Sequence, residues 1–204
     1  MTLRRSFYLT FPLLLVFSCS EPPKAVKKEV KKAEPVTGQK AFHNMYIAAR
    51  QWSPDVQIMR ITSIPLDGQD NSGKDGKAWA WSATFISASK GKAKMFTYSA
   101  IEGEGNLHKG VFGNQEESYN PRGSDKPYPV AALKLDTDKA WEIASVKGAD
   151  YAKKNPDKPV VFLAELSNRS PDVTWRVLWG SSASTANFSV LIDASTGKFL
   201  EVLH

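Results

Sequence analysis

The sequence predicts an α+β fold made of two tandem units, each a helix followed by three or four antiparallel strands (α-β-β-β). Two segments place apolar residues at helical spacing, and each of them ends at a proline. A β-rich run and then a tryptophan-led strand follow each helix in the same order. Large apolar residues alternate in these strands with small or polar ones, which is typical of half-buried antiparallel strands.

The first residues have the pattern of an export signal. Arg4 and Arg5 precede a mostly apolar run from Phe7 to Phe17, and Cys19, the only cysteine, follows. Eleven residues are too few to span a bilayer of ~30 Å as a helix. The segment resembles a bacterial lipoprotein signal with a lipobox, which implies removal of residues 1–18 and acylation of Cys19. An ordinary cleaved signal peptide is the alternative.

Residues 19–37 are expected to form a lipidated, flexible tether, because they hold five lysines, prolines near both ends and little apolar surface. Acyl chains on Cys19 would make the membrane a partner, since each buried methylene contributes ~0.8 kcal/mol. In the lipoprotein family an aspartate after the cysteine implies retention on the inner membrane. Ser20 stands there, so we expect the outer membrane. A contact of the lysines with an anionic surface is the alternative role for this segment.

The net charge of +6 overstates how basic the folded part is. Two arginines belong to the signal and five lysines to the tether, which leaves 20 basic and 18 acidic residues from residue 38 onward. Export and this balance argue against nucleic acid as a partner. With its single cysteine acylated, the mature chain would have no disulfide, so its stability must come from its core.

The first unit is assigned to residues 38–110. Thr37 is its expected helix N-cap, and Pro54 follows the helix. The expected strands are Val56–Ile64, Trp81–Phe85 and Met95–Tyr98.

The second unit is assigned to residues 135–204, with Asp136 as N-cap and one helix that continues through Tyr151 to Pro156. Its expected strands are Val160–Leu166, Trp175–Trp179 and Phe188–Ile192, and a turn containing Gly197 leads into a last apolar strand. The second unit resembles a PepSY domain. The resemblance rests on the tryptophan-led strand, the strand closing on Asp-Ala-Ser-Thr-Gly-Lys, and the Lys139-Ala-Trp helix. The first unit lacks that ending, so it is interpreted as a diverged PepSY-like or cystatin-like unit. A single α+β domain is the alternative.

Residues 111–134 are interpreted as the connection between the repeats, since they are polar and rich in turn residues. The alternative is a functional loop region, in which His108, Lys109, Tyr119 and Arg122 would be binding residues.

No catalytic constellation is found, so we expect a protein that is not an enzyme and needs no cofactor or metal. The segment Gly68–Asp75 is close to the P-loop pattern, but Asp75 occupies the position where a serine or threonine hydroxyl must bind magnesium. The three histidines are scattered, and neither HExxH nor Gly-x-Ser-x-Gly occurs.

Aromatic side chains on the strands are the other candidate binding residues. Alternation would put Trp79 and Trp81 on one face, and Trp175 and Trp179 on one face. Core packing is one role for such residues; a partly exposed face that includes Tyr98 and binds a partner is the other.

The sequence therefore predicts a lipid-anchored envelope protein that acts as a non-catalytic binding or regulatory module. The PepSY resemblance implies that the partner is an extracytoplasmic peptidase or another envelope protein. In the inhibitor version an added strand would occupy the peptidase cleft. A structural or assembly component of the outer membrane is the alternative. An exposed edge strand beside Trp79 and Trp81 would favour partner binding, whereas two edges paired with each other would favour a closed scaffold.

Overall fold

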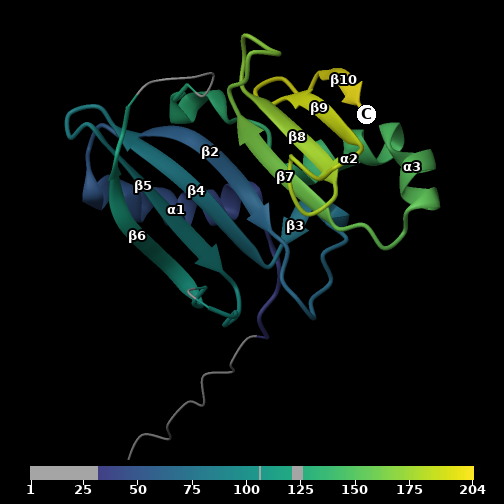
Figure 1. Ribbon diagram of the computed structural model, residues 1–204, viewed down its shortest axis with the longest axis horizontal. Helices are drawn as coiled ribbons and strands as arrows, with labels where there is room; N and C mark the ends of the chain where they lie inside the picture. Colours follow the sequence, from purple (N-terminus) through teal and green to yellow (C-terminus); the bar gives the residue numbers. More distant parts are fainter. Residues whose placement is uncertain (1–31, 106, 121–125) are drawn as a thin grey trace, which may run out of the picture. The chain divides into compact units, whose positions relative to one another are not determined.

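The computed structural model describes residues 32–105, 107–120 and 126–204, and residues 33–204 form one compact unit. An eight-stranded antiparallel sheet dominates this unit, with the strand order β10-β9-β8-β7-β2-β4-β5-β6 (Figure 1). The predicted α+β class is confirmed. The signal peptide 1–18, Cys19 and most of the tether lie outside the described residues.

Each half of the unit is a helix followed by a four-stranded meander. In the first half the elements are α1 (Gly38–Trp52), β2 (Gln57–Ile64), β4 (Ala80–Ser87), β5 (Lys92–Ser99) and β6 (Gly110–Ser118). In the second half they are α2 (Thr137–Lys147), α3 (Ala149–Lys154), β7 (Val160–Glu165), β8 (Thr174–Trp179), β9 (Ser189–Asp193) and β10 (Phe199–Leu203). Short elements complete the fold: β1 (Val36–Thr37) pairs with β3 (Lys77–Ala78), and two 3₁₀ turns span Lys74–Gly76 and Val130–Ala132.

The two halves meet in the middle of the sheet, where β2 pairs antiparallel with β7. Both halves therefore contribute to a single sheet. One buried cluster includes α1 residues such as Met45, α2 residues such as Ala140, and the inward residues of β4 and β8. The helices thus cover one face of the sheet and share one core, and among the described residues no helix covers most of the opposite face.

Equivalent tryptophans occupy equivalent places in the two halves. Trp81 and Trp175 are both fully buried. The indole N–H of Trp81 donates to the carbonyl of Val36 over 3.1 Å, and that of Trp175 donates to Leu135 over 2.8 Å. Each acceptor lies two residues before the helix of its own half, so each tryptophan fixes the start of a helix while it fills the core. Trp179 also packs in this core, on the face of Trp175, as predicted.

Both predicted N-cap positions are confirmed, but side chains of the second half cap both helices. Thr37 makes no side-chain capping bond. Instead, Oδ1 of Asp136 accepts from the backbone N–H of Gln39 and from that of Thr137. Oγ1 of Thr137 accepts from the N–H of Gly38 over 2.8 Å and donates to the carbonyl of Gly76 over 2.6 Å. The cap of the second helix thus also caps the first.

Two elements differ from the sequence prediction. Residues 110–118 form strand β6, although most of them were assigned to the connection 111–134. After Phe112 the strand has no apolar alternation because it lies at the end of the sheet and is largely exposed. The predicted single second helix is divided at Gly148, where a Cβ would lie 2.5 Å from the ring of Trp179.

Candidate functional site

The predicted aromatic residues Trp81 and Tyr98 lie on the helix-covered face of the sheet. They are directly opposite each other across β4 and β5, and both pack in the main core. Burial therefore supports core packing for Trp81. Trp79 lies at a bend before β4, is half-buried and uses its carbonyl to accept from the N–H of Ala100. The alternation expected to join Trp79 to Trp81 fails because the strand begins one residue later.

His108 and Lys109 lie in the loop that joins β5 to β6, and both contact Glu102. His108 Nδ1 lies 2.6 Å from Glu102 Oε1, and the N–H of Lys109 donates to Oε2 over 3.1 Å. The hydrogen bond with His108, and then that from Lys109, hold the pKa of Glu102 below its usual range. The His108 ring also lies 4.8 Å from that of Phe112 on β6. These contacts close the loop on itself.

Tyr119, another predicted site residue, lies away from this loop. Tyr119 follows β6, and its N–H donates to the carbonyl of Gly91. The register of β5 and β6 pairs Lys92 with Ser118 and Ser99 with Gly110, so Tyr119 lies at the opposite end of β6 from His108. Arg122 lies outside the described residues, as does the predicted lipid-attachment residue Cys19.

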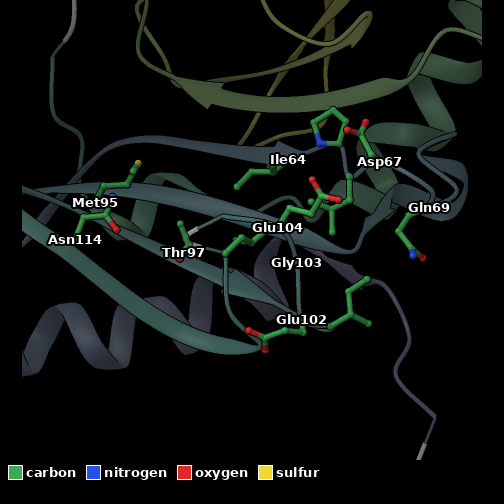
Figure 2. A pocket seen from close by; sticks show the side chains of 13 residues that line it. Ile64, Asp67, Gln69, Met95, Thr97, Glu102, Gly103, Glu104 and Asn114 are labelled. Atoms are coloured by element: carbon green, nitrogen blue, oxygen red, sulfur yellow. The ribbon is translucent and has the colours of Figure 1, made fainter.

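A cavity of about 620 Å³ lies on the face of the sheet opposite the core, and the sequence did not predict it (Figure 2). Its volume falls within the range of ~300–1,000 Å³ that is usual for ligand pockets. Strand residues meet two loops there, one after β2 and one between β5 and β6. The lining residues are Ile64, Pro65, Leu66, Asp67, Gln69, Met95, Thr97, Ile101, Glu102, Gly103, Glu104, Leu107 and Asn114.

The floor of this cavity follows from the alternation in β5. Phe96 and Tyr98 pack in the core, so Met95 and Thr97 face the other side of the sheet. Met95 is 37% exposed, so it presents apolar surface on the cavity's side of the sheet. The pattern Met-Phe-Thr-Tyr was the only sequence signal for the floor, and it did not reveal the loops that form the walls.

Thr97, which lines the cavity, carries a buried hydroxyl that lacks a hydrogen-bond partner among the described residues. Its side chain is 8% exposed, and Oγ1 is the one buried side-chain polar atom with no hydrogen-bond partner among the residues described. A buried hydroxyl without a partner costs ~1–3 kcal/mol. Thr97 lines the cavity while its Oγ1 is itself buried, so a ligand could satisfy this hydroxyl after rotation about χ1.

A second polar cluster, around Asp55, is structural. Its carboxylate accepts from the N–H of Ser89 and from the hydroxyls of Ser53 and Ser87. The same donors, with Ser89 first, lower the pKa of Asp55 far below its ordinary value. A carboxylate held so firmly in its charged form is a poor base, and the cluster instead ties the end of α1 to the β4–β5 turn.

Within the described part of the chain, no three His, Cys, Asp or Glu residues are grouped so that they could hold a metal ion. None of the helices in that part has the length and apolar character needed to cross a bilayer.

Comparisons with known proteins give one match. No protein-family model matches the chain, and no curated protein matches it. Among solved structures, the chain is similar to a protein described as a putative lipoprotein from Clostridium difficile 630, with 10% identity and a TM-score of 0.43. The alignment covers 79% of this chain and 91% of that chain. Similarity at this level does not establish a family or a function, so the site must be interpreted from its own residues.

Proposed function

We propose that this chain is a lipid-anchored protein of the bacterial cell envelope that binds a protein partner and catalyses no reaction. The observation that carries the proposal is strand β6, nine residues long and largely exposed. In the described structure β6 has a strand neighbour, β5, on one side only. A strand edge of this kind presents unpaired N–H and C=O groups to an extended segment of another protein.

The position of this edge favours partner binding over a closed scaffold. The strands at the two ends of the sheet, β6 and β10, are not paired with each other within the part of the chain described. The edge strand is not beside Trp81 as expected, because β4, which carries the buried Trp81, lies between β2 and β5. The two unpaired ends of the described sheet are the part of the expectation that supports a binding module.

A peptidase is the partner class that the PepSY resemblance of residues 135–204 suggests. In that version β6 or its preceding loop would occupy the peptidase cleft as an added strand, which depends on main-chain hydrogen bonds. Phe112, 44% exposed on β6, would be a side-chain anchor at such an interface.

The contacts of the polar residues support a role without catalysis. A serine- or cysteine-type mechanism needs a hydroxyl or thiol beside a base. His108 contacts Glu102 and the Phe112 ring, neither of which carries a hydroxyl or thiol. The serines around Asp55 face a carboxylate with a depressed pKa instead of a base.

Membrane attachment is proposed from Cys19 and its preceding signal. Acylation there would leave residues 20–32 as a spacer between the membrane and the folded unit, which begins at Ala33 and includes β1. The binding edge would then act at a membrane surface, which we propose to be that of the outer membrane.

Site-specific crosslinking tests this proposal. A photo-crosslinking amino acid replaces Phe112 in the full chain, and in a matched variant it replaces Val146, which is 74% exposed on α2. Both variants are irradiated in native membranes, with and without Cys19→Ala, and the products are identified by mass spectrometry. One defined protein crosslinked from position 112 but not from position 146, and lost with Cys19→Ala, supports the proposal. Equal products from both positions, or none from position 112, contradict it.

A structural or assembly role is the second candidate. Both β6 and β10 are end strands, so copies of the chain could pair edge to edge in a non-closing array. Crosslinks from position 112 to a second copy, or to outer-membrane assembly proteins, would favour this role over restraint of a peptidase.

A further inference from the structure

The charges around the cavity on the open face of the sheet all have one sign. Asp67, Glu102 and Glu104 line it, and its lining contains no lysine or arginine. Asp67 and Glu104 form no ion pair with any residue described, whereas Glu102 is engaged by His108. Figure 2 shows the side chain of Glu104 extending toward the loop that carries Asp67. The cavity thus offers two uncompensated carboxylates to a cation.

The rest of the lining suits the aliphatic part of a ligand. Ile64, Leu66, Met95, Ile101 and Leu107 provide apolar surface beneath and between the carboxylates. A lysine or arginine side chain combines an aliphatic stem with a cationic head, so it can bury the stem and keep the head among acidic groups.

Thr97 adds a polar group to the lining of this cavity. Its hydroxyl is buried and has no partner among the described residues, and the residue is more than nine-tenths buried. Rotation about χ1 moves Oγ1 between staggered positions, so a donor or acceptor that enters the cavity can satisfy it. This observation is independent of the acidic residues and points to a polar ligand at the same place.

The cavity adjoins the free edge of the sheet. Asn114 of β6 lines it, and the loop with Glu102 and Glu104 leads directly into β6. Two of the most exposed large apolar residues, Met95 and Phe112, belong to β5 and β6. A segment that pairs with β6 would therefore pass beside the cavity, and its alternate side chains would point toward the cavity's face of the sheet.

We propose that this cavity receives a lysine or arginine side chain from an extended, basic segment of a protein partner that pairs with β6. This rests on the proposed function and names the chemistry of the partner. Asp67 and Glu104 bind the cationic head, the apolar residues hold the stem, and Thr97 accepts from or donates to a polar group of the segment. A volume of about 620 Å³ is more than one side chain fills, which favours a segment over a single small amine.

Calorimetric titration of the full chain in a non-ionic detergent tests the proposal. The probe is a capped seven-residue peptide of alternating valine and lysine, and the matched peptides replace lysine with glutamate or threonine. N-acetyl-lysine amide represents a small amine. We expect the lysine peptide to bind and the other three probes to bind at least about tenfold more weakly, a difference of ~1.4 kcal/mol.

Variants of the chain locate the binding. The double variant Asp67→Asn, Glu104→Gln should weaken the lysine peptide about tenfold, and Thr97→Val about threefold or more. Glu117→Gln, a matched loss of an exposed charge on β6 outside the cavity lining, should change the affinity less than about twofold. An unchanged affinity in the double variant, or equal binding of the glutamate peptide or of N-acetyl-lysine amide, overturns the proposal.

The basic-segment site and the proposed function can fail separately. If the lysine peptide does not bind while crosslinks from position 112 persist in membranes, the cavity chemistry is wrong and partner binding stands. If those crosslinks are also missing, the proposed function fails as well.

Discussion

The same substitution, threonine to valine, should have opposite effects at two positions. Valine has the shape of threonine but cannot form hydrogen bonds. At position 137 the hydroxyl serves the buried N–H of Gly38 and the carbonyl of Gly76. Thr137→Val leaves two buried backbone groups unpaired at ~1–3 kcal/mol each, so we expect a loss of about 2–5 kcal/mol in the free energy of unfolding. At position 97 the hydroxyl has no partner among the described residues, so Thr97→Val should raise the free energy of unfolding by about 1 kcal/mol.

Urea unfolding followed by tryptophan fluorescence measures both effects on the full chain. For a unit of this size 1 kcal/mol corresponds to ~2–4 °C in the melting temperature, so thermal unfolding should give shifts of opposite sign. A change at position 137 within 0.5 kcal/mol of zero would refute the claim that Thr137 joins the two halves. A clear loss at position 97 would refute the claim that its hydroxyl is unsatisfied.

Three further predictions concern the junction of the halves and the Asp55 cluster. Gly76→Ala should lower the free energy of unfolding by about 3 kcal/mol or more, because Gly76 has a φ of +67° and an added Cβ would lie 2.2 Å from the carbonyl oxygen of Thr137. The control Gly105→Ala has a similar φ but open space around the added Cβ, so it should cost only ~1 kcal/mol in the same urea assay. Asp136→Ala should lower the free energy of unfolding by about 1–2 kcal/mol, and Asp136→Asn should lower it less, since asparagine can still cap both helices. Equal losses for the two variants would argue against the capping role. The pKa of Asp55 is lowered in the folded state, so its contribution to stability is complete above the ordinary value of 3.8 and is lost as the pH falls below it. The urea midpoint should therefore drop more between about pH 5 and pH 3 in the wild type than in Asp55→Asn, and parallel pH profiles would contradict this.

Local pattern was enough to predict most elements of the fold. The spacing of Phe42, Met45 and Ala49 follows one face of α1, and these residues are buried. The tryptophan-led strands appear as β4 and β8, and both N-cap positions are as expected. These features depend on residues a few positions apart, where periodicity and capping act.

Contacts between distant parts of the chain could not be predicted in the same way. Asp136 caps α1 across 97 residues, and the pairing of β2 with β7 merges the two halves into one sheet. Neither contact leaves a local pattern. Strand β6 was missed for a related reason: an exposed end strand buries few side chains, so Gly113 to Ser118 lack the apolar alternation that identifies a strand.

The candidate site was predicted only in part. His108 and Lys109 were selected as exposed loop residues, and they lie in the loop beside the cavity. The cavity itself forms because the loop after β2 comes to the loop before β6, which places Asp67 and Glu104 together from positions 37 residues apart. Trp81 and Tyr98 were selected as aromatic strand residues, but the sequence could not show which face of the strand the helices cover.

Hydrogen exchange of the full chain with and without the valine–lysine peptide shows whether an extended basic segment pairs with β6. If an extended basic segment pairs with β6, the backbone amides of Gly110–Ser118 should exchange more slowly in the complex, while those of Phe199–Leu203 at the other end of the sheet should not change. Protection at β10 instead of β6, or binding without added protection in β6, would contradict the account.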